Sequence, residues 1–407
     1  MKILQVNKFY YPKDGVSNYL LGIEAKLREL GHEVKVFAMD NPKNLPSGEQ
    51  KYFVSYISFD QPGLINSWRA LTRIFYSREA ARKFAALIKD FRPDIIHLHN
   101  IYHQISPSIL RIAKKEKIPV IMHLHDYKLI CPNYKLFTQG NICQRCRGGK
   151  YYNCFWHKCL KNSYPKSLGG TLEMYFHHKL WKIYETGVKT FIAPSKFMKK
   201  TCEDFGWPAD KIVWLNNFFK QPAEVNYPSE QTESNSYLLY FGRLAEEKGV
   251  KILLQALTKN EENLKIVGEG PEELALKEMT KKLNLTERVE FTGFKSSLDL
   301  ENIIKNAKAI IIPSVWYENM PLNLLESLAQ GKIVIASNIG GIPEIIENGE
   351  NGLLFKAGSE DDLAEKIKLL KTIDYPRMAR AAKETVKHLN IDTHIAALLK
   401  IYETVLK

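Results

Sequence analysis

Two glutamates eight positions apart, Glu318 and Glu326, are the residues whose type and spacing best suit the chemistry of a sugar nucleotide. One carboxylate can accept hydrogen bonds from sugar hydroxyls, and the other can accept them from a ribose diol. The backbone amides that begin a helix between the two glutamates would favour an anion such as a phosphate. The alternative interpretation is a solvated helix face, where most glutamates lie.

The residues around this pair predict its position in a fold. The apolar run from Ala309 to Ile312 has the length of a strand, and Pro313 and Ser314 end it. A helix is predicted after Pro321, because three leucines share one face, namely Leu324, Leu325 and Leu328. A strand that leads through a loop into a helix places loop groups at the carboxyl edge of a parallel sheet, where open α/β folds bind ligands.

The rest of the second half repeats this pattern, which predicts a doubly wound α/β domain with a nucleotide-sized crevice. The other expected strands are 237–241, 264–267, 289–291 and 333–336, and each runs into a turn that contains glycine. Arg243 and Lys248 follow the first of these strands and are placed to neutralise a diphosphate. The alternative is a pair of solvated surface cations.

The first half begins with a βαβ pattern and continues with strands that end in histidines. The expected elements are a strand 2–6, a helix 19–30 and a strand 33–38, with Gly15 in the first loop as a weak phosphate-binding signal. The alternation of two later strands places His97 with His99 on one face, and His123 with His125 on one face. We predict an active-site role for His125, which precedes Asp126 at a strand end, and structural roles for the other three.

The length of 407 residues predicts two domains, and a hydrophobic content of 45% excludes a disordered chain. We expect a domain at 1–220, a linker rich in Pro, Glu and Ser at 221–236, and a second domain at 237–385. The helix at 386–407 is expected to pack back on the first domain. No apolar run approaches the roughly 20 residues that span a bilayer. The N-terminus lacks the features of a signal peptide, so we expect a cytoplasmic protein.

The positive charge is concentrated in the first half of the chain. Residues 1–220 carry 35 Lys and Arg against 17 Asp and Glu, whereas the remainder carries 23 against 28. This excess implies an acidic partner, such as anionic lipid, a phosphorylated acceptor or nucleic acid, unless it is only a basic soluble surface. The stretch 64–88 predicts a basic helix on the inner face of a membrane, or a helix packed on the sheet. The candidate lipid contacts are Arg69, Arg73, Arg78, Arg82 and Lys83.

Cysteines cluster in a loop at residues 131–160. A structural zinc site is predicted from two pairs, Cys143 with Cys146 and Cys154 with Cys159, because four thiolates fill a tetrahedral site. The alternative is a set of free or redox-active thiols. No Asp-x-Asp pair stands at the end of a predicted strand, so we expect no catalytic metal.

Taken together, these motifs resemble those of the family 4 glycosyltransferases of bacterial surface-polysaccharide biosynthesis, which are retaining enzymes of the GT-B fold. The resemblance rests on Gly242-Arg-Leu-x-x-Glu-Lys248-Gly, Val267-Gly-x-Gly270-Pro, Phe291-x-Gly293, Glu318 with Glu326, and Gly340-Gly-x-Pro-Glu344. It implies two Rossmann-like domains facing each other across a cleft, with the acceptor in the first and the donor in the second. One departure is Asp14-Gly15, where many members have Gly-Gly.

The resemblance also implies roles for single residues. Arg243 and Lys248 would hold the donor diphosphate, and Glu326 would bind the ribose. Glu318 and His125 would contact the donor sugar and support catalysis. The other donor-binding positions that it implies are Gly15, Gly268, Phe294, Asn319, Met320, Pro321 and Leu322.

We therefore predict a retaining hexosyltransferase that moves a sugar from a nucleotide-sugar donor to a lipid-linked or saccharide acceptor. One alternative is a nucleotide-sugar epimerase of the same two-domain shape, which would not need Glu318 and Glu326 at these positions. Another is a zinc-containing nucleic-acid-binding protein, although the basic half lacks interleaved aromatic repeats. We expect no nucleic-acid partner.

Overall fold

The computed structural model describes residues 1–57, 73–219, 237–295 and 297–407, and these form two compact units. The N-terminal unit comprises 1–134, 144–216 and 391–407, and the C-terminal unit comprises 135–143 and 217–390. The predicted linker at 221–236 lies outside the described residues, as does Arg69.

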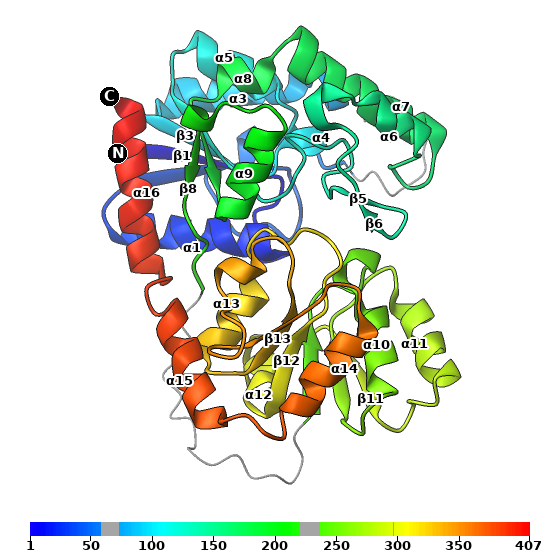
Figure 1. The fold of residues 1–407 in the computed structure, drawn as a ribbon. Helices are drawn as coiled ribbons and strands as arrows, with labels where there is room; N and C mark the ends of the chain where they lie inside the picture. The colour runs from blue at the N-terminus through cyan, green and yellow to red at the C-terminus, as the bar shows by residue number, and fades with distance from the viewer. Residues whose placement is uncertain (58–72, 220–236, 296) are drawn as a thin grey trace. The chain divides into compact units, whose positions relative to one another are not determined.

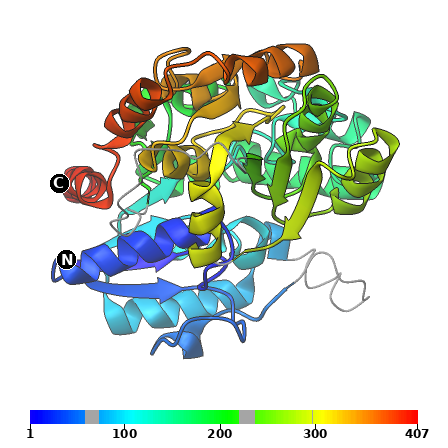
Figure 2. The same ribbon diagram turned by 90° about the horizontal axis from the view of Figure 1, so that it is seen from below.

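The N-terminal unit is built on a parallel sheet with the strand order β2-β1-β3-β4-β7-β8. Its strands are β1 (Lys2–Val6), β2 (Glu33–Phe37), β3 (Ile95–Leu98), β4 (Val120–His123), β7 (Thr190–Ala193) and β8 (Ile212–Trp214). Helices α1 (Gly15–Glu29) and α3 (Arg78–Phe91) lie on opposite faces of the first strands (Figure 2). Because both faces are covered, β1, β3 and β4 are almost entirely buried.

The other helices of this unit are α4 (Tyr102–Ile105), α5 (Ser108–Lys115), α6 (Tyr152–Trp156), α7 (Tyr164–Met174), α8 (Ile183–Gly187), α9 (Lys196–Asp204) and α16 (Ile391–Leu406). A π-helical segment, η3 (Tyr175–Leu180), continues α7, and short 3₁₀ turns are η1 (Gln50–Tyr52), η2 (Arg147–Gly149) and η4 (Ala209–Lys211). Although α16 ends the chain, it lies beside α1, near the chain's beginning (Figure 1).

Two sequence predictions in this unit were wrong in detail. Helix α1 begins at Gly15 rather than at Tyr19, because the Asp14 carboxylate accepts a hydrogen bond from the Ser17 amide at 2.9 Å and caps the helix. Arg73 is buried instead of facing a membrane, since its guanidinium lies 2.6 Å from the Glu79 carboxylate and donates to the Ser55 carbonyl.

The other candidates for lipid contact differ from Arg73. Arg78 and Arg82 are exposed on α3, whereas Lys83 is half-buried and 3.3 Å from a carboxylate oxygen of Glu79. Only two of the five basic residues therefore present an exposed side chain on described structure.

The C-terminal unit has a second parallel sheet with the order β11-β10-β9-β12-β13-β14. Its strands are β9 (Tyr237–Phe241), β10 (Leu264–Val267), β11 (Val289–Gly293), β12 (Ala307–Ile312), β13 (Val334–Ser337) and β14 (Leu353–Phe355). Its helices are α10 (Val250–Leu257), α11 (Glu273–Lys282), α12 (Ser297–Lys305), α13 (Leu322–Ala329), α14 (Glu360–Leu369) and α15 (Tyr375–Val386). Two apolar cores cover the two faces of this sheet, which confirms the doubly wound α/β class.

Two 3₁₀ turns complete this unit, η5 (Glu246–Lys248) and η6 (Ile342–Glu344). A two-stranded hairpin, β5 (Phe137–Thr138) and β6 (Asn141–Ile142), also groups with it although both neighbouring stretches of the chain belong to the N-terminal unit.

Candidate active site

The turns at the carboxyl edge of the second sheet are packed backbone against backbone. A Cβ atom on Gly268 would lie 1.9 Å from the carbonyl oxygen of Gly242, and one on Gly340 would lie 2.2 Å from that of Glu318. Both glycines also have a positive φ, which L side chains rarely adopt. The predicted convergence of these turns on one edge is confirmed, and glycine is required where they touch.

Glu318 and Lys248, predicted from two separate turns, are brought together. Lys248 ends η5, and its Nζ lies 2.6 Å from the Glu318 Oε1, which also accepts a hydrogen bond from the Ser314 hydroxyl at 2.6 Å. The Glu318 side chain is 5% exposed and that of Lys248 is 25% exposed. Lys248 is therefore part of a buried polar cluster and not a solvated surface cation.

The N-terminus of α13 lies just after this cluster. Pro321 is the N-cap residue, and its ring supplies no side-chain acceptor for the first amides of the helix. Asn319 and Met320 are buried, and the Met320 carbonyl accepts a hydrogen bond from the Asn217 amide at 3.2 Å. Glu326 lies about one turn into the helix and is half-buried, and its ribose contact stays a prediction.

Two further predicted donor contacts are exposed at the same edge. Arg243 is exposed directly after β9, and the Tyr240 hydroxyl donates to its carbonyl oxygen at 2.8 Å. Phe294 follows β11 with 75% of its surface exposed, and the Gly268 amide donates to the Gly293 carbonyl beside it. An exposed aromatic ring offers a face on which a nucleotide base can stack.

One ion pair at this edge was missed by the sequence analysis. Glu247 is buried beside Lys248, and its carboxylate lies 3.0 Å from the Nζ of Lys135, which precedes the β5–β6 hairpin. Burial alone would raise the pKa of Glu247, but the charge of Lys135 and the hydrogen bonds to the carboxylate lower it. The partners are 112 positions apart, so no local pattern indicated the contact.

In the N-terminal unit, His125 belongs to a cluster of histidine rings that lie side by side. The His97, His99 and His123 rings are fully buried, whereas His125 is half-buried at the end of β4. Two residues that the sequence analysis missed, Tyr19 and His394, complete the cluster: the Tyr19 hydroxyl lies 3.1 Å from His123 Nδ1 and 2.7 Å from His394 Nε2.

Hydrogen bonds define the protonation of the His125 ring. The Oε1 of Gln5 lies 2.8 Å from His99 Nε2, which must therefore carry the proton. His99 Nδ1 is then an acceptor, and it receives the proton of His125 Nε2 at 3.0 Å. Burial, and then the neighbouring His99 and Lys8, lower the pKa of His125 well below its usual range. His125 is thus neutral, with its lone pair on Nδ1.

The predicted phosphate contact at Gly15 meets an unfavourable neighbour. Gly15 is exposed and is the first residue of α1, but the Asp14 carboxylate already caps this helix. A carboxylate at that point repels an approaching anion. The Gly15 contact stays a prediction.

The cysteine loop carries thiols in different surroundings. Cys146 and Cys154 are buried, and Cys143 and Cys159 are half-buried. A hydrogen bond to Cys159, followed by burial, raises the pKa of Cys154. Within the four described stretches of the chain, no group of three or more His, Cys, Asp or Glu side chains is arranged to hold a metal ion. The described structure thus gives no support for the zinc site, which stays a prediction.

Elemental analysis of protein purified without chelator is the test of that prediction. About one equivalent of zinc per chain, lost together with folding of the loop on chelation, is the expected result. Less than about one tenth of an equivalent, with all four thiols reactive toward a thiol reagent, would dismiss the site.

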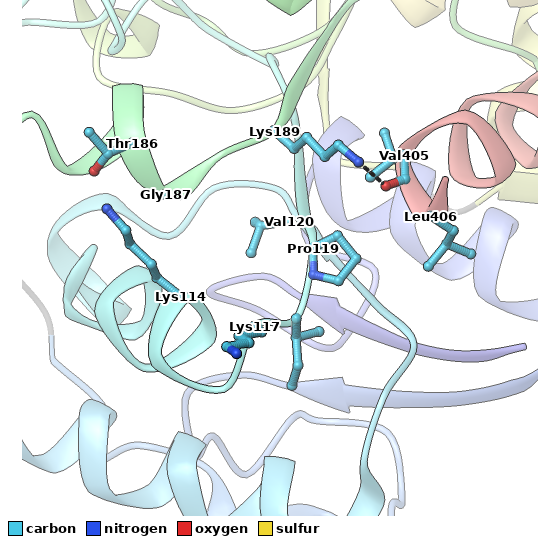
Figure 3. Close-up of a pocket in the computed structure, with 10 residues that line it drawn as sticks. Lys114, Lys117, Pro119, Val120, Thr186, Gly187, Lys189, Val405 and Leu406 are labelled. Atoms are coloured by element: carbon cyan, nitrogen blue, oxygen red, sulfur yellow. Dashed lines mark hydrogen bonds between the residues drawn. The ribbon is translucent and has the colours of Figure 1, made fainter.

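A shallow pocket of about 370 Å³ lies in the N-terminal unit away from these residues. It is lined by Lys114, Lys117 and Lys189, with Pro119 and Leu406 among its apolar walls (Figure 3). It adjoins the start of β4, opposite the strand end that carries His125. The pocket is therefore distinct from the candidate active site. One of its three lysines, Lys189, already donates a hydrogen bond to the Val405 carbonyl oxygen.

The fold of the two units is that of the GT-B class. A crystal structure of Anabaena Alr3699/HepE in complex with UDP is similar, with a TM-score of 0.68 and 18% identity over 99% of this chain and 100% of that one. The described part of the chain contains no helix that is both long and apolar enough to cross a membrane.

The chain belongs to glycosyltransferase family 4, whose model matches residues 13–219, and the model for glycosyl transferases group 1 matches 226–388. An N-acetyl-alpha-D-glucosaminyl L-malate synthase of Bacillus anthracis is 29% identical over 392 residues, which are 94% of this chain and 92% of the relative. A relative from Campylobacter jejuni is named an N,N'-diacetylbacillosaminyl-diphospho-undecaprenol alpha-1,3-N-acetylgalactosaminyltransferase. It is 30% identical over 202 residues, which are 47% of this chain and 52% of that relative.

Proposed function

We propose that this glycosyltransferase moves a hexose, with retention, from a nucleotide sugar to a lipid-linked or saccharide acceptor. The observation that carries the proposal is the buried Lys248–Glu318 pair beside the N-terminus of α13. The UDP complex of HepE supports a nucleotide-sugar donor, and the name of the Campylobacter relative supports a lipid-diphosphate-linked acceptor. Assembly of a surface polysaccharide remains the proposed pathway, although the Bacillus relative is named for transfer to malate.

The arrangement suggests how the donor is activated. Negative charge develops on the diphosphate as its bond to the sugar breaks. Arg243, Lys248 and the first amides of α13 would stabilise this charge. Lys248 is held by Glu318 and the amides by the helix, so these groups would need little reorganisation. The Glu318 carboxylate would accept hydrogen bonds from the sugar hydroxyls. The contact of His125 with the donor sugar rests on the family resemblance alone. We favour direct front-face transfer over a covalent Glu318–sugar intermediate.

Arg243→Ala and Lys248→Ala test the diphosphate contact. Each change is expected to weaken nucleotide binding about 10- to 150-fold, because a hydrogen bond to a charged group contributes about 1.5–3 kcal/mol. Calorimetric titration with a nucleoside diphosphate measures the effect. Lys251→Ala is the matched control, since Lys251 is a nearby lysine on α10 that pairs with Glu272. Unchanged affinity in both test variants would refute the assignment.

A further inference from the structure

A stripe of exposed apolar side chains runs along α7 and η3 in the N-terminal unit. Five of its members follow one another at four-residue steps and are between 36% and 66% exposed: Tyr164, Leu168, Leu172, Phe176 and Leu180. Tyr152 and Trp156 on the adjoining α6 extend the stripe, with exposures of 48% and 66%. Both helices are labelled at the upper right of Figure 1. We call these seven residues the apolar stripe.

The π-helical segment keeps the stripe straight. Four residues slightly exceed one turn of an α-helix, so four-residue steps drift around α7 in one direction. A π turn contains more residues, and here the Trp181 amide bonds to the Phe176 carbonyl five positions back. The same steps therefore drift in the opposite direction along η3. Phe176 and Leu180 return to the line of Leu168 and Leu172, and the stripe extends for roughly 24 Å.

The segment that carries the apolar stripe is rich in basic residues, although one of them, Arg147, lies 3.7 Å from the Asp204 carboxylate. Between residues 145 and 182 the chain carries eight Lys and Arg and a single acidic residue, Glu173. Glu173 is buried and 2.8 Å from both Lys128 and His103, so it contributes no exposed negative charge. The exposed basic residues are Arg145, Arg147, Lys150, Lys161, Lys166, Lys179 and Lys182.

We propose that the apolar stripe docks this enzyme on an anionic membrane surface. Exposed aromatic and leucine side chains flanked by lysines are the composition of an interfacial helix, whose apolar side enters the headgroup boundary. The basic residues would meet lipid phosphates, and a soluble protein partner would not require this excess of basic residues. The surface differs from the α3 face predicted from the sequence. The role of this membrane docking, which would bring the enzyme to its acceptor, rests on the proposed lipid-linked acceptor. The docking surface itself does not depend on that proposal.

Co-sedimentation of the full-length protein with vesicles tests this proposal. We expect binding to vesicles of equal parts phosphatidylglycerol and phosphatidylcholine, and weak binding to phosphatidylcholine alone. Trp156→Ser combined with Leu180→Ser should weaken binding by about tenfold or more, because both side chains are 66% exposed on the stripe. Lys161→Glu combined with Lys166→Glu should weaken it about fivefold per residue, less so at high salt.

The matched controls change similar residues elsewhere. Leu274→Ser, at a side chain 78% exposed on α11, and Lys281→Glu combined with Lys282→Glu should leave vesicle binding unchanged. Wild-type binding by the stripe variants would overturn the proposal, as would loss caused only by Arg78→Glu with Arg82→Glu. Stripe-dependent self-association without vesicle binding would assign the surface to a second copy instead. Nucleotide affinity, measured in the same variants, should be unaffected, so a failure of the donor assignment would be recognised separately.

Discussion

Lowering the pH from 7 to 5 is expected to destabilise the N-terminal unit strongly and the C-terminal unit little. Burial lowers the pKa of His97, His99, His123 and His125 well below 6.5, and it lowers that of His394 to about 4. Below pH 6.5 the unfolded chain therefore binds protons that the folded chain does not, and stability falls as the pH falls.

The expected loss is large. Each such histidine contributes about 1.4 kcal/mol per pH unit, so five contribute up to about 7 kcal/mol per unit, against a typical total stability of 5–15 kcal/mol. Asp126 and Glu24, whose pKa values burial raises, oppose the trend but are only two groups. The loss should begin near pH 6.5 and continue toward pH 4.

Urea unfolding at a series of pH values, followed by tryptophan fluorescence, measures this effect. Five of the six tryptophans precede residue 217, so the signal reports mainly the N-terminal part of the chain. His388→Gln, at an exposed histidine of the C-terminal unit, should leave the pH dependence unchanged. A midpoint that stays constant between pH 7 and pH 5 would contradict the assignment of neutral buried histidines.

The second large effect is expected from Glu318→Gln. An amide keeps the shape of the side chain but removes the charge that faces Lys248, and it replaces one of the two acceptor oxygens that the donor sugar would use with an NH2 donor. We expect kcat to fall about 100-fold or more, because loss of one fixed electrostatic contact commonly costs 10²–10³ in rate. Steady-state kinetics with a nucleotide-sugar donor measures kcat and KM separately.

Two neighbouring changes separate this role from a general disturbance of the turn. Ser314→Ala removes the other hydrogen bond to the same carboxylate, and kcat should fall by less than about tenfold. Glu326→Gln should raise the donor KM more than it lowers kcat, since its predicted contact is to the ribose. Wild-type turnover in a folded Glu318→Gln variant would remove Glu318 from the catalytic group.

Features that depend on short apolar runs along the chain could be predicted from the sequence. The approach of Lys248 to Glu318 follows from two strands whose carboxyl ends meet at one edge, and both strands were visible as apolar runs. The Tyr19–His394 and Lys135–Glu247 contacts join residues 375 and 112 positions apart, and no periodicity carries such information.

Two errors had different physical causes. Arg73 was a candidate lipid contact because basic amphipathic periodicity does not reveal whether a carboxylate and carbonyl oxygens lie within reach of the guanidinium. The start of α1 was misplaced although a signal was present, since Asp14 is a favourable N-cap residue.

The position of α16 has a consequence for the order in which the protein is made. The N-terminal unit includes residues 391–407, and Tyr402 is fully buried there against His97 and Gln5. A ribosome makes residues 391–407 after the rest of the N-terminal unit and after the C-terminal unit. The N-terminal unit therefore lacks part of its core while the C-terminal unit is being made. The C-terminal unit, complete at residue 390, has all of its residues earlier. A fragment that stops at residue 216 should expose apolar surface on α1 and aggregate, and a fragment that stops at residue 390 should do the same.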